Sequence, residues 1–501
     1  MRTRQLLGIG LVVLSVVAAV RAAEPDRRLV EAAKKSDTAA VRALLKQKAP
    51  LNTAATDGTT ALHWVVRADD METARLLLKA GADAKLADRY GITALKLAAE
   101  NGNAAMIELL VKAGADPNAT LPDGETVLMT ASRTGKPDAV KALLSHGAKP
   151  NAKETRFGEN ALMWAAARNN AAAIRVLASN GANLNDKSNL TTFPEFKFIT
   201  SGMVTTSLPK GGWTALMYAA RQGSTEAARA LAEVGADLNQ VDPDGTTALV
   251  VAIINAHFDL AAMLADKGAD PNVADTSGMT ALYAAVDMHN LGAMLSRPGP
   301  KVTDELDAAG LVPVLIKRGA NPNLRLKKPI IGRHHDSGDA SMGEGTTPLM
   351  RAAKAVDIPV IRALLEGGAN PAITQKDYSN TVMVLLGARG GNEAAILQAI
   401  KLCVEHGLDV DAFNANGQTA VHLAVQKGAD SIVRYLAEKG AKLDMKNKQG
   451  RTPMDLALGV GGAGGGAGGA RGARGGGGPG GPGGPGGGNL STATVLREFL
   501  R

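Results

Sequence analysis

Glycine recurs through this chain at a fixed interval of 33 residues. Two sets near the N-terminal end keep that step: Gly81, Gly114 and Gly147, and Gly58, Gly91 and Gly124. Pairs further along keep it again: Gly235 with Gly268, and Gly407 with Gly440. A chain of 501 residues is too long for one conventional hydrophobic core. A period of roughly 20 to 50 residues instead predicts an elongated array of small repeated units.

The chemistry of one unit, residues 88–118, predicts what each repeat forms. Thr93 can cap a short apolar helix, which the pair Asn101-Gly102 then ends. A second, bulkier helix follows, and Gly114 supplies the left-handed conformation that closes it. The turn-rich segment 116–124 fits a hairpin-like finger that leads into the next unit. One helix pair cannot bury its apolar face alone, so neighbouring units must hold one another in place.

These residues resemble the ankyrin repeat, whose family pattern is D-x-x-G-x-T-P-L-H-x-A-A, a glycine turn, and V-x-x-L-L-x-x-G-A-x-x-N. Alanine replaces the proline in most copies, as at Ala61, whereas Pro348 and Pro453 keep it. The histidine survives at His63 and His422. The resemblance implies an all-α solenoid of about twelve helix–turn–helix units with hairpin-like fingers. Alanine pairs on the inner helices permit close approach, so we expect a curved stack with fingers and inner helices on its concave side.

The two ends of the array, which we expect to span residues 23–458, depart from the pattern. Residues 29–52 lack the finger glycine and are expected to form an N-terminal cap. The last unit is interrupted by a glycine-dominated run, 459–488, which we expect to be a disordered linker. Residues 489–501 are then expected to supply the missing outer helix as a C-terminal cap.

Three insertions exceed ordinary loop lengths: residues 186–210, 288–307 and 324–344. The first and third enter at finger level, whereas the second separates the helices of the eighth unit. The first holds three of the seven phenylalanines, at Phe193, Phe196 and Phe198. These rings either pack the loop onto neighbouring units or offer an apolar contact to a partner.

The N-terminal residues match a secretory signal peptide. Arg2 and Arg4 precede an apolar run, 6–20, that is too short for a comfortable membrane span. Small residues before Ala23 predict cleavage after Ala22, so we expect a periplasmic or secreted protein of bacterial type without stable membrane insertion. Retention of the segment as an anchor is the alternative. Removing residues 1–22 lowers the formal net charge from +8 to +5, a mild excess that does not indicate nucleic-acid binding.

Catalytic and metal-binding signatures are scarce. The chain has no nucleophile elbow, no phosphate-binding lysine loop and no H-E-x-x-H motif. Cys403 is the single cysteine, so neither an internal disulfide nor a cysteine-rich zinc site is possible. The third insertion contains the cluster His334, His335, Asp336 and Asp339. Adjacent histidines in a loop seldom both ligate one metal, so we expect no cofactor and no enzymatic activity.

The resemblance places the residue after each inner-helix alanine pair on the concave side. Arginine dominates this position from the second to the sixth unit, although Glu100 occupies it in the third, and aromatic and arginine residues lie on the fingers beside it. The expected partner-binding residues are Arg67, Arg89, Tyr90, Arg133, Phe157, Arg168, Trp213 and Arg221, together with Phe193, Phe196 and Phe198. Trp64 and Trp164 occupy inner-helix positions that we expect to point between units as core residues.

The sequence therefore predicts a monomeric, non-catalytic scaffold in the cell envelope. Its concave surface is expected to bind a protein partner that carries acidic groups. Two alternatives stay open at this stage. One is a metal-dependent accessory protein or enzyme that uses the histidine-containing loop. The other is a secreted effector that acts on a host protein.

Overall fold

The computed structural model describes residues 26–191, 197–198, 204–205, 210–290, 304–330, 342–388, 390–460 and 489–500. The chain divides into two compact units. The first comprises residues 1–165 and 172–183, and the second comprises residues 166–171 and 184–501.

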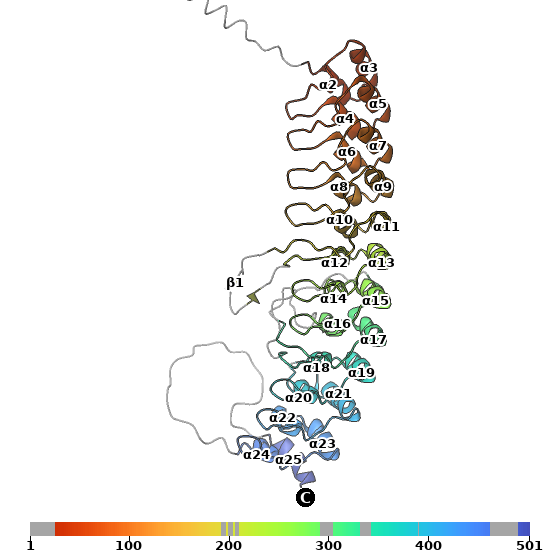
Figure 1. Cartoon of the computed structure of the whole chain (residues 1–501). Coiled ribbons are helices and arrows are strands. Elements are labelled where there is room, and N and C mark those ends of the chain that lie inside the picture. Colours follow the sequence, from red (N-terminus) through yellow and green to blue (C-terminus); the bar gives the residue numbers. More distant parts are fainter. Residues whose placement is uncertain are drawn as a thin grey trace, which may run out of the picture. The chain divides into compact units, whose positions relative to one another are not determined.

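Antiparallel helix pairs build the first unit. The pairs are α2 (Arg28–Lys34) with α3 (Thr38–Lys46), α4 (Ala61–Arg67) with α5 (Met71–Ala80), α6 (Ala94–Asn101) with α7 (Ala104–Lys112), α8 (Val127–Arg133) with α9 (Pro137–Ser145), and α10 (Ala161–Ala167) with α11 (Ala171–Ser179). Figure 1 shows the inner helices α4, α6 and α8 in one row beside the fingers, and the outer helices α5, α7 and α9 in a second row. Among these inner helices, α2 packs on α4, α4 on α6, and α6 on α8.

Local sequence sets the helix ends. The Thr93 hydroxyl accepts a hydrogen bond from the Lys96 amide at 3.2 Å, which confirms the predicted cap of α6. Asn103 caps α7 in the same way, with its side-chain oxygen 3.0 Å from the Met106 amide. Gly114, just beyond α7, adopts a φ of +97°, the left-handed conformation that the sequence predicts.

The core lies between the two rows of helices. Met106, Ile107 and Leu110 of α7 are fully buried, whereas Leu109 is half-buried. Burial of one helical face on each pair leaves the opposite face of the outer helices to solvent. The apolar surface is thus shared between successive pairs, and no pair has a complete core of its own.

Asparagines after the outer helices join successive repeats. Asn118 accepts a hydrogen bond from the Lys149 amide at 2.9 Å and donates one to the Gly147 carbonyl at 3.0 Å. Asn151 repeats both bonds one unit further on, with Asn183 and Gly181. Neighbouring fingers are also joined, because the Arg89 amide donates to the Asp57 carbonyl at 2.9 Å.

Seven further helix pairs build the second unit. They are α12 (Ala215–Gln222) with α13 (Thr225–Glu233), α14 (Ala248–Ile254) with α15 (Phe258–Asp266), α16 (Ala281–Asn290) with α17 (Ala308–Lys317), α18 (Pro348–Lys354) with α19 (Ile358–Glu366), α20 (Thr381–Leu386) with α21 (Glu393–Glu405), α22 (Ala420–Lys427) with α23 (Asp430–Glu438), and α24 (Pro453–Leu458) with α25 (Leu490–Phe499). With the first unit, the described residues hold twelve helix pairs, which confirms the predicted all-α solenoid of about twelve repeats.

The first insertion lengthens a finger into a hairpin. Ser188 and Trp213 exchange backbone and side-chain hydrogen bonds at its base, and Leu190 pairs with Gly211. Further out, strands β1 (Lys197–Phe198) and β2 (Val204–Thr205) pair antiparallel. The insertion therefore continues the two strands of an ordinary finger.

The second insertion is fastened to the preceding unit by a reciprocal pair of carboxylates. Asp304 accepts a hydrogen bond from the Asp259 amide at the start of α15, at 2.8 Å. The Asp259 carboxylate accepts in return from the amides of Glu305 and Leu306, at 2.8 and 3.0 Å. The third insertion has its two ends joined in one finger. Leu326, before the insertion, exchanges backbone hydrogen bonds with the segment 345–346, after it.

The final helix pair carries on the row despite the glycine-rich run between its members. Helix α25 packs against both α23 and α24. Asn489 caps α25, and the Thr492 hydroxyl donates to Asp430 of α23 at 2.5 Å. The glycine-rich segment 461–488 lies outside the described residues.

Candidate binding surface

The first unit presents a tryptophan ring covered by cations. Trp64 lies half-buried in the middle of α4, with Lys34 Nζ 5.4 Å and Arg67 Cζ 5.6 Å from its ring centroid. Both cations are exposed. A cation over an indole face gains about 0.5–1 kcal/mol at such a site. The stacking therefore holds two positive charges in place at the surface of the inner helices.

A cation again lies over a tryptophan three repeats further on, and here it comes from the preceding repeat, as Lys34 does for Trp64. Trp164 occupies the position in α10 that Trp64 occupies in α4, and Arg133 Cζ lies 5.5 Å from its ring centroid. The indole nitrogens of both tryptophans are buried and have no hydrogen-bond partner in the described residues. The nitrogen-bearing edge of each ring therefore points inward while a face meets a cation. These residues were expected to be core residues, and the structure places them half-buried at the border of the core.

Two fingers of the first unit carry exposed arginine–aromatic pairs. Arg89 Cζ lies 4.8 Å from the ring centroid of Tyr90, and Arg89 donates a hydrogen bond to the Tyr90 hydroxyl at 2.6 Å. Arg156 covers Phe157 at the same 4.8 Å. Tyr90 is 56% exposed and Phe157 is 40% exposed. Arg156 was missed at the sequence level, although its place beside Phe157 in a finger was the available signal.

In the second unit a finger residue meets the inner helix directly. The rings of Trp213 and Tyr218 are 5.7 Å apart in an edge-to-face contact, and Arg221 Cζ lies 5.4 Å from the Trp213 ring centroid. Arg221 is exposed, whereas Trp213 is only 9% exposed. Trp213 therefore supports Arg221 from beneath and offers little surface of its own. Arg168 is exposed on the same unit.

Several predicted residues lie in the insertions. Phe193 and Phe196 lie outside the described residues, and only the backbone of Phe198 is described, in β1. The cluster His334, His335, Asp336 and Asp339 also lies outside them. Within the described ranges, no group of three or more histidine, cysteine or carboxylate side chains is arranged to hold a metal ion.

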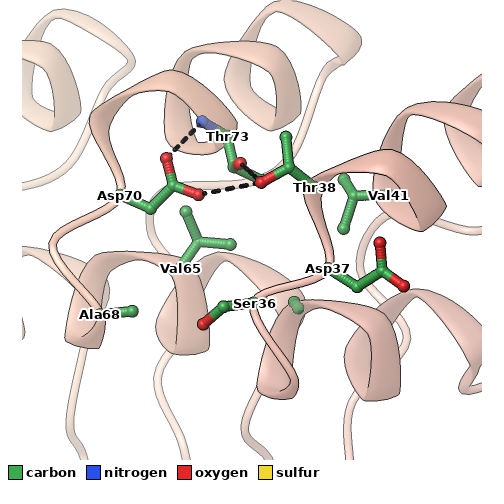
Figure 2. Close-up of a pocket in the computed structure, with 9 residues that line it drawn as sticks. Ser36, Asp37, Thr38, Val41, Val65, Ala68, Asp70 and Thr73 are labelled. Carbon is green, nitrogen blue, oxygen red and sulfur yellow. Dashed lines mark hydrogen bonds between the residues drawn. The ribbon is translucent and has the colours of Figure 1, made fainter.

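A small hollow between the turns of the first two helix pairs contains polar groups but no catalytic arrangement. Figure 2 shows Asp70 accepting hydrogen bonds from the Thr73 amide and the Thr38 hydroxyl, at 3.0 and 3.4 Å. The hydroxyls of Thr38 and Thr73 lie 3.1 Å apart. Asp70 is the cap of α5, so these contacts end one helix and join it to its neighbour.

Two buried histidines and the cysteine have shifted pKa values that burial explains. His63 Nδ1 accepts from the Thr60 amide, and Nε2 lies 3.0 Å from the Ile92 carbonyl of the next unit. Burial lowers the pKa of His63, and it lowers the pKa of His422, which makes the same contacts. Burial raises the pKa of the Cys403 thiol to about 12, so this cysteine is neutral and unreactive at ordinary pH.

Comparison with known proteins identifies the class of this repeat fold. A family model described as "Ankyrin repeats (3 copies)" matches residues 29–121, 106–188, 196–275, 234–296 and 384–462. A single-repeat model, "Ankyrin repeat", matches residues 344–376. Together these matches cover well over half of the chain, and the chain belongs to the ankyrin-repeat family. Repeats of this family generally mediate protein–protein interaction.

Several curated proteins share part of the array. One is the "Ankyrin repeat, SAM and basic leucine zipper domain-containing protein 1" of Dasypus novemcinctus, 33% identical over 21% of this chain and 23% of the relative. The "E3 ubiquitin-protein ligase KEG" of Arabidopsis thaliana is 27% identical over 30% of this chain and 8% of the relative. The "Palmitoyltransferase AKR1" of Lachancea kluyveri is 26% identical over 27% of this chain and 18% of the relative. The chain thus spans less than a quarter of each relative's length.

No helix in the described part of the chain is both long enough and apolar enough to cross a bilayer.

Proposed function

We propose that this chain is a non-catalytic scaffold whose inner-helix and finger surface binds a protein partner that carries acidic groups. The observation that supports this proposal is the repeated stacking of an exposed arginine on a tryptophan. Arg67, Arg133 and Arg221 lie 5.4–5.6 Å from the ring centroids of Trp64, Trp164 and Trp213, respectively. Arginine and aromatic residues are the preferred anchors of protein interfaces.

These arginines are held without being neutralised. No carboxylate among the described residues forms an ion pair with Arg67, Arg133 or Arg221. The outer helices differ, because Arg318 of the second unit lies 2.6 Å from a carboxylate oxygen of Asp266. A guanidinium that stacks on a ring keeps its N–H groups free for bidentate contact with a carboxylate. Its conformational entropy is also partly lost before binding, which favours affinity.

Charge reversal tests the proposal. The variant Arg67→Glu/Arg133→Glu/Arg221→Glu should no longer capture the partner from a native envelope extract. The matched control is Arg75→Glu/Arg229→Glu/Arg362→Glu, which makes the same charge change at exposed positions of the outer helices α5, α13 and α19. Loss of the same captured protein from the first variant alone supports the proposal. Equal capture by both variants contradicts it.

The cell envelope is the proposed site of action, and the charged and apolar pattern of residues 2–22 supports it. N-terminal sequencing of the protein recovered from the periplasm should begin at Ala23. Recovery of the whole protein in the cytoplasm with Arg2 retained would contradict export.

A further inference from the structure

One finger of the second unit lacks the turn glycine that the other fingers share. Among the described residues, ten fingers place glycine at the last position of the turn, as at Gly91 and Gly417, both with positive φ. In the finger before α20 this position is Tyr378, with a φ of +61°. The turn is otherwise the same, because Tyr378 N donates to the Gln375 carbonyl at 3.0 Å, as Gly91 N donates to that of Asp88. A bulky side chain in this conformation is strained.

The Tyr378 side chain leaves its finger toward the next one. A Cβ added at Gly417 would lie 3.0 Å from the Lys448 amide of the following finger, and one at Gly245 would lie 3.1 Å from Asp275 Cα. This position therefore faces the neighbouring finger backbone. For Tyr378 that neighbour is the segment 413–415, because the Ala415 amide donates to the Asp377 carbonyl at 2.7 Å.

A second exposed aromatic residue stands on that neighbouring finger. Phe413 is 59% exposed and Tyr378 is 63% exposed. Among the described residues, neither ring has an aromatic neighbour or a covering cation, and the Tyr378 hydroxyl has no hydrogen-bond partner. The exposed rings of the first unit differ, because arginines cover Tyr90 and Phe157 at 4.8 Å. More than half of each of these residues is thus open to solvent, and no ring or cation contact among the described residues offsets the strained turn.

The charges around the two rings are mostly positive. The three successive finger segments 374–380, 413–419 and 446–452 contain four basic residues and one acidic residue, and one of the basic residues, Lys376, pairs with Glu344 of the preceding finger at 2.8 Å. The acidic residue, Asp377, accepts hydrogen bonds from the amide and the hydroxyl of Ser379, at 3.0 and 2.9 Å. Lys446 and Lys448 are exposed and form no ion pair with a described residue.

We infer that Tyr378 and Phe413 form a second docking surface, which binds an extended peptide segment of another protein that combines apolar and acidic side chains. The two rings contact the apolar side chains, and Lys446 and Lys448 pair with the carboxylates. This surface belongs to the second unit and shares no residue with the arginine surface proposed above. The strained turn is retained because the tyrosine is needed for binding.

Restoring the finger glycine separates binding from folding. All variants are made in a chain that also carries Arg67→Glu/Arg133→Glu/Arg221→Glu. The probe is a short fluorescein-labelled peptide that alternates glutamate with phenylalanine, and fluorescence anisotropy measures its binding. Tyr378→Gly should weaken its binding about ten-fold or more while raising the melting temperature, because strain is removed together with a binding residue. Phe413→Thr, which installs the residue found at the equivalent Thr120, should weaken binding without unfolding the chain.

The same assay tests the role of the two lysines and the identity of the bound partner. Lys446→Glu/Lys448→Glu should weaken binding, and a probe with glutamine in place of glutamate should bind less tightly. Absence of peptide binding, or binding that Tyr378→Gly and Phe413→Thr leave unchanged, overturns the inference. Concentration-dependent self-association that Tyr378→Gly abolishes would also overturn it, because the occupant would then be a second copy of the chain. Because the arginines are already reversed, neither result depends on the arginine surface.

Discussion

Asn272 accepts a hydrogen bond from the Asn321 amide at 2.7 Å, although the two residues are 49 positions apart. The same link joins Asn239 to Asp270 over 31 positions, where no insertion intervenes. The inserted residues between α16 and α17 therefore leave the step between successive units unchanged. Inner and outer helices of the second unit accordingly pack on their neighbours on both sides of this insertion.

Replacing Asn272 by alanine should loosen the array at this point. The substitution removes the bond to Asn321 and the bond that Asn272 donates to the Gly319 carbonyl at 2.9 Å. Each such bond contributes about 1 kcal/mol net. Amide hydrogen exchange should therefore increase in α17, with a smaller change in distant helices. Unchanged protection in α17 would show that the asparagine link does not fasten the inserted unit.

The first helix pair holds a lysine where later units have glycine. Lys48 has a φ of +55° and is exposed, at the position that Gly81 occupies in the next unit. Lys48→Gly should stabilise the protein by about 1 kcal/mol, because a side chain in the left-handed region is disfavoured. Urea unfolding followed by circular dichroism measures the change. Gly81→Lys serves as the reverse control, and stabilisation by both substitutions would refute the explanation.

The two buried histidines should make the fold sensitive to mild acid. Burial lowers the pKa values of His63 and His422, so the unfolded chain takes up protons first as pH falls below about 6.5. Their stabilising contribution is complete above that pH and is lost as pH falls through the folded-state pKa values. The urea midpoint should therefore drop between pH 7.5 and pH 5.5.

Methionine is the matched replacement for these histidines, because Met129 and Met163 occupy the same inner-helix position in other units. His63→Met/His422→Met should flatten the dependence of the urea midpoint on pH over this interval. A slope equal to that of the unmodified chain would assign the acid sensitivity to other groups.

A buried ion pair joins the third and fourth repeats. Lys96 Nζ lies 2.7 Å from Glu125 Oε1 and 2.9 Å from the Thr130 hydroxyl, and both charged side chains are largely buried. Lys96→Met should cost about 3 kcal/mol, because it leaves the largely buried Glu125 carboxylate without its cation. Glu125→Thr should cost less, because Glu100 Oε1 lies 3.8 Å from Lys96 Nζ and remains as a partner. The double variant should be close to the unmodified chain in urea unfolding. Additive losses in the double variant would contradict this coupling.

The repeat period alone predicts most of the fold. Thr93 and Gly114 mark helix ends, and the structure confirms both. The contact between Asp259 and Asp304 was not predictable, because it joins a repeat to inserted residues that follow no period. The burial of Trp213 likewise depends on the hairpin that the first insertion builds beside it.

The candidate surface was predictable only in outline. The exposed positions of Arg67 and Arg133 follow from the repeat, but their stacking on tryptophans does not. Sequence position places Trp64 and Arg67 on one mainly apolar helix, whereas the distance from Trp64 to Lys34 depends on how two repeats meet. Tyr378 could have been found by aligning the finger glycines, since it is the exception in a column of glycine.

The affinity of the captured partner for purified protein tests the central claim most directly. Binding to the unmodified chain, to Arg67→Glu/Arg133→Glu/Arg221→Glu and to Arg75→Glu/Arg229→Glu/Arg362→Glu should be measured over a range of salt concentrations. We predict affinity that falls with salt, a loss of about 100-fold or more for the first variant, and little change for the second. Equal affinities for all three proteins would contradict a binding surface built on these arginines.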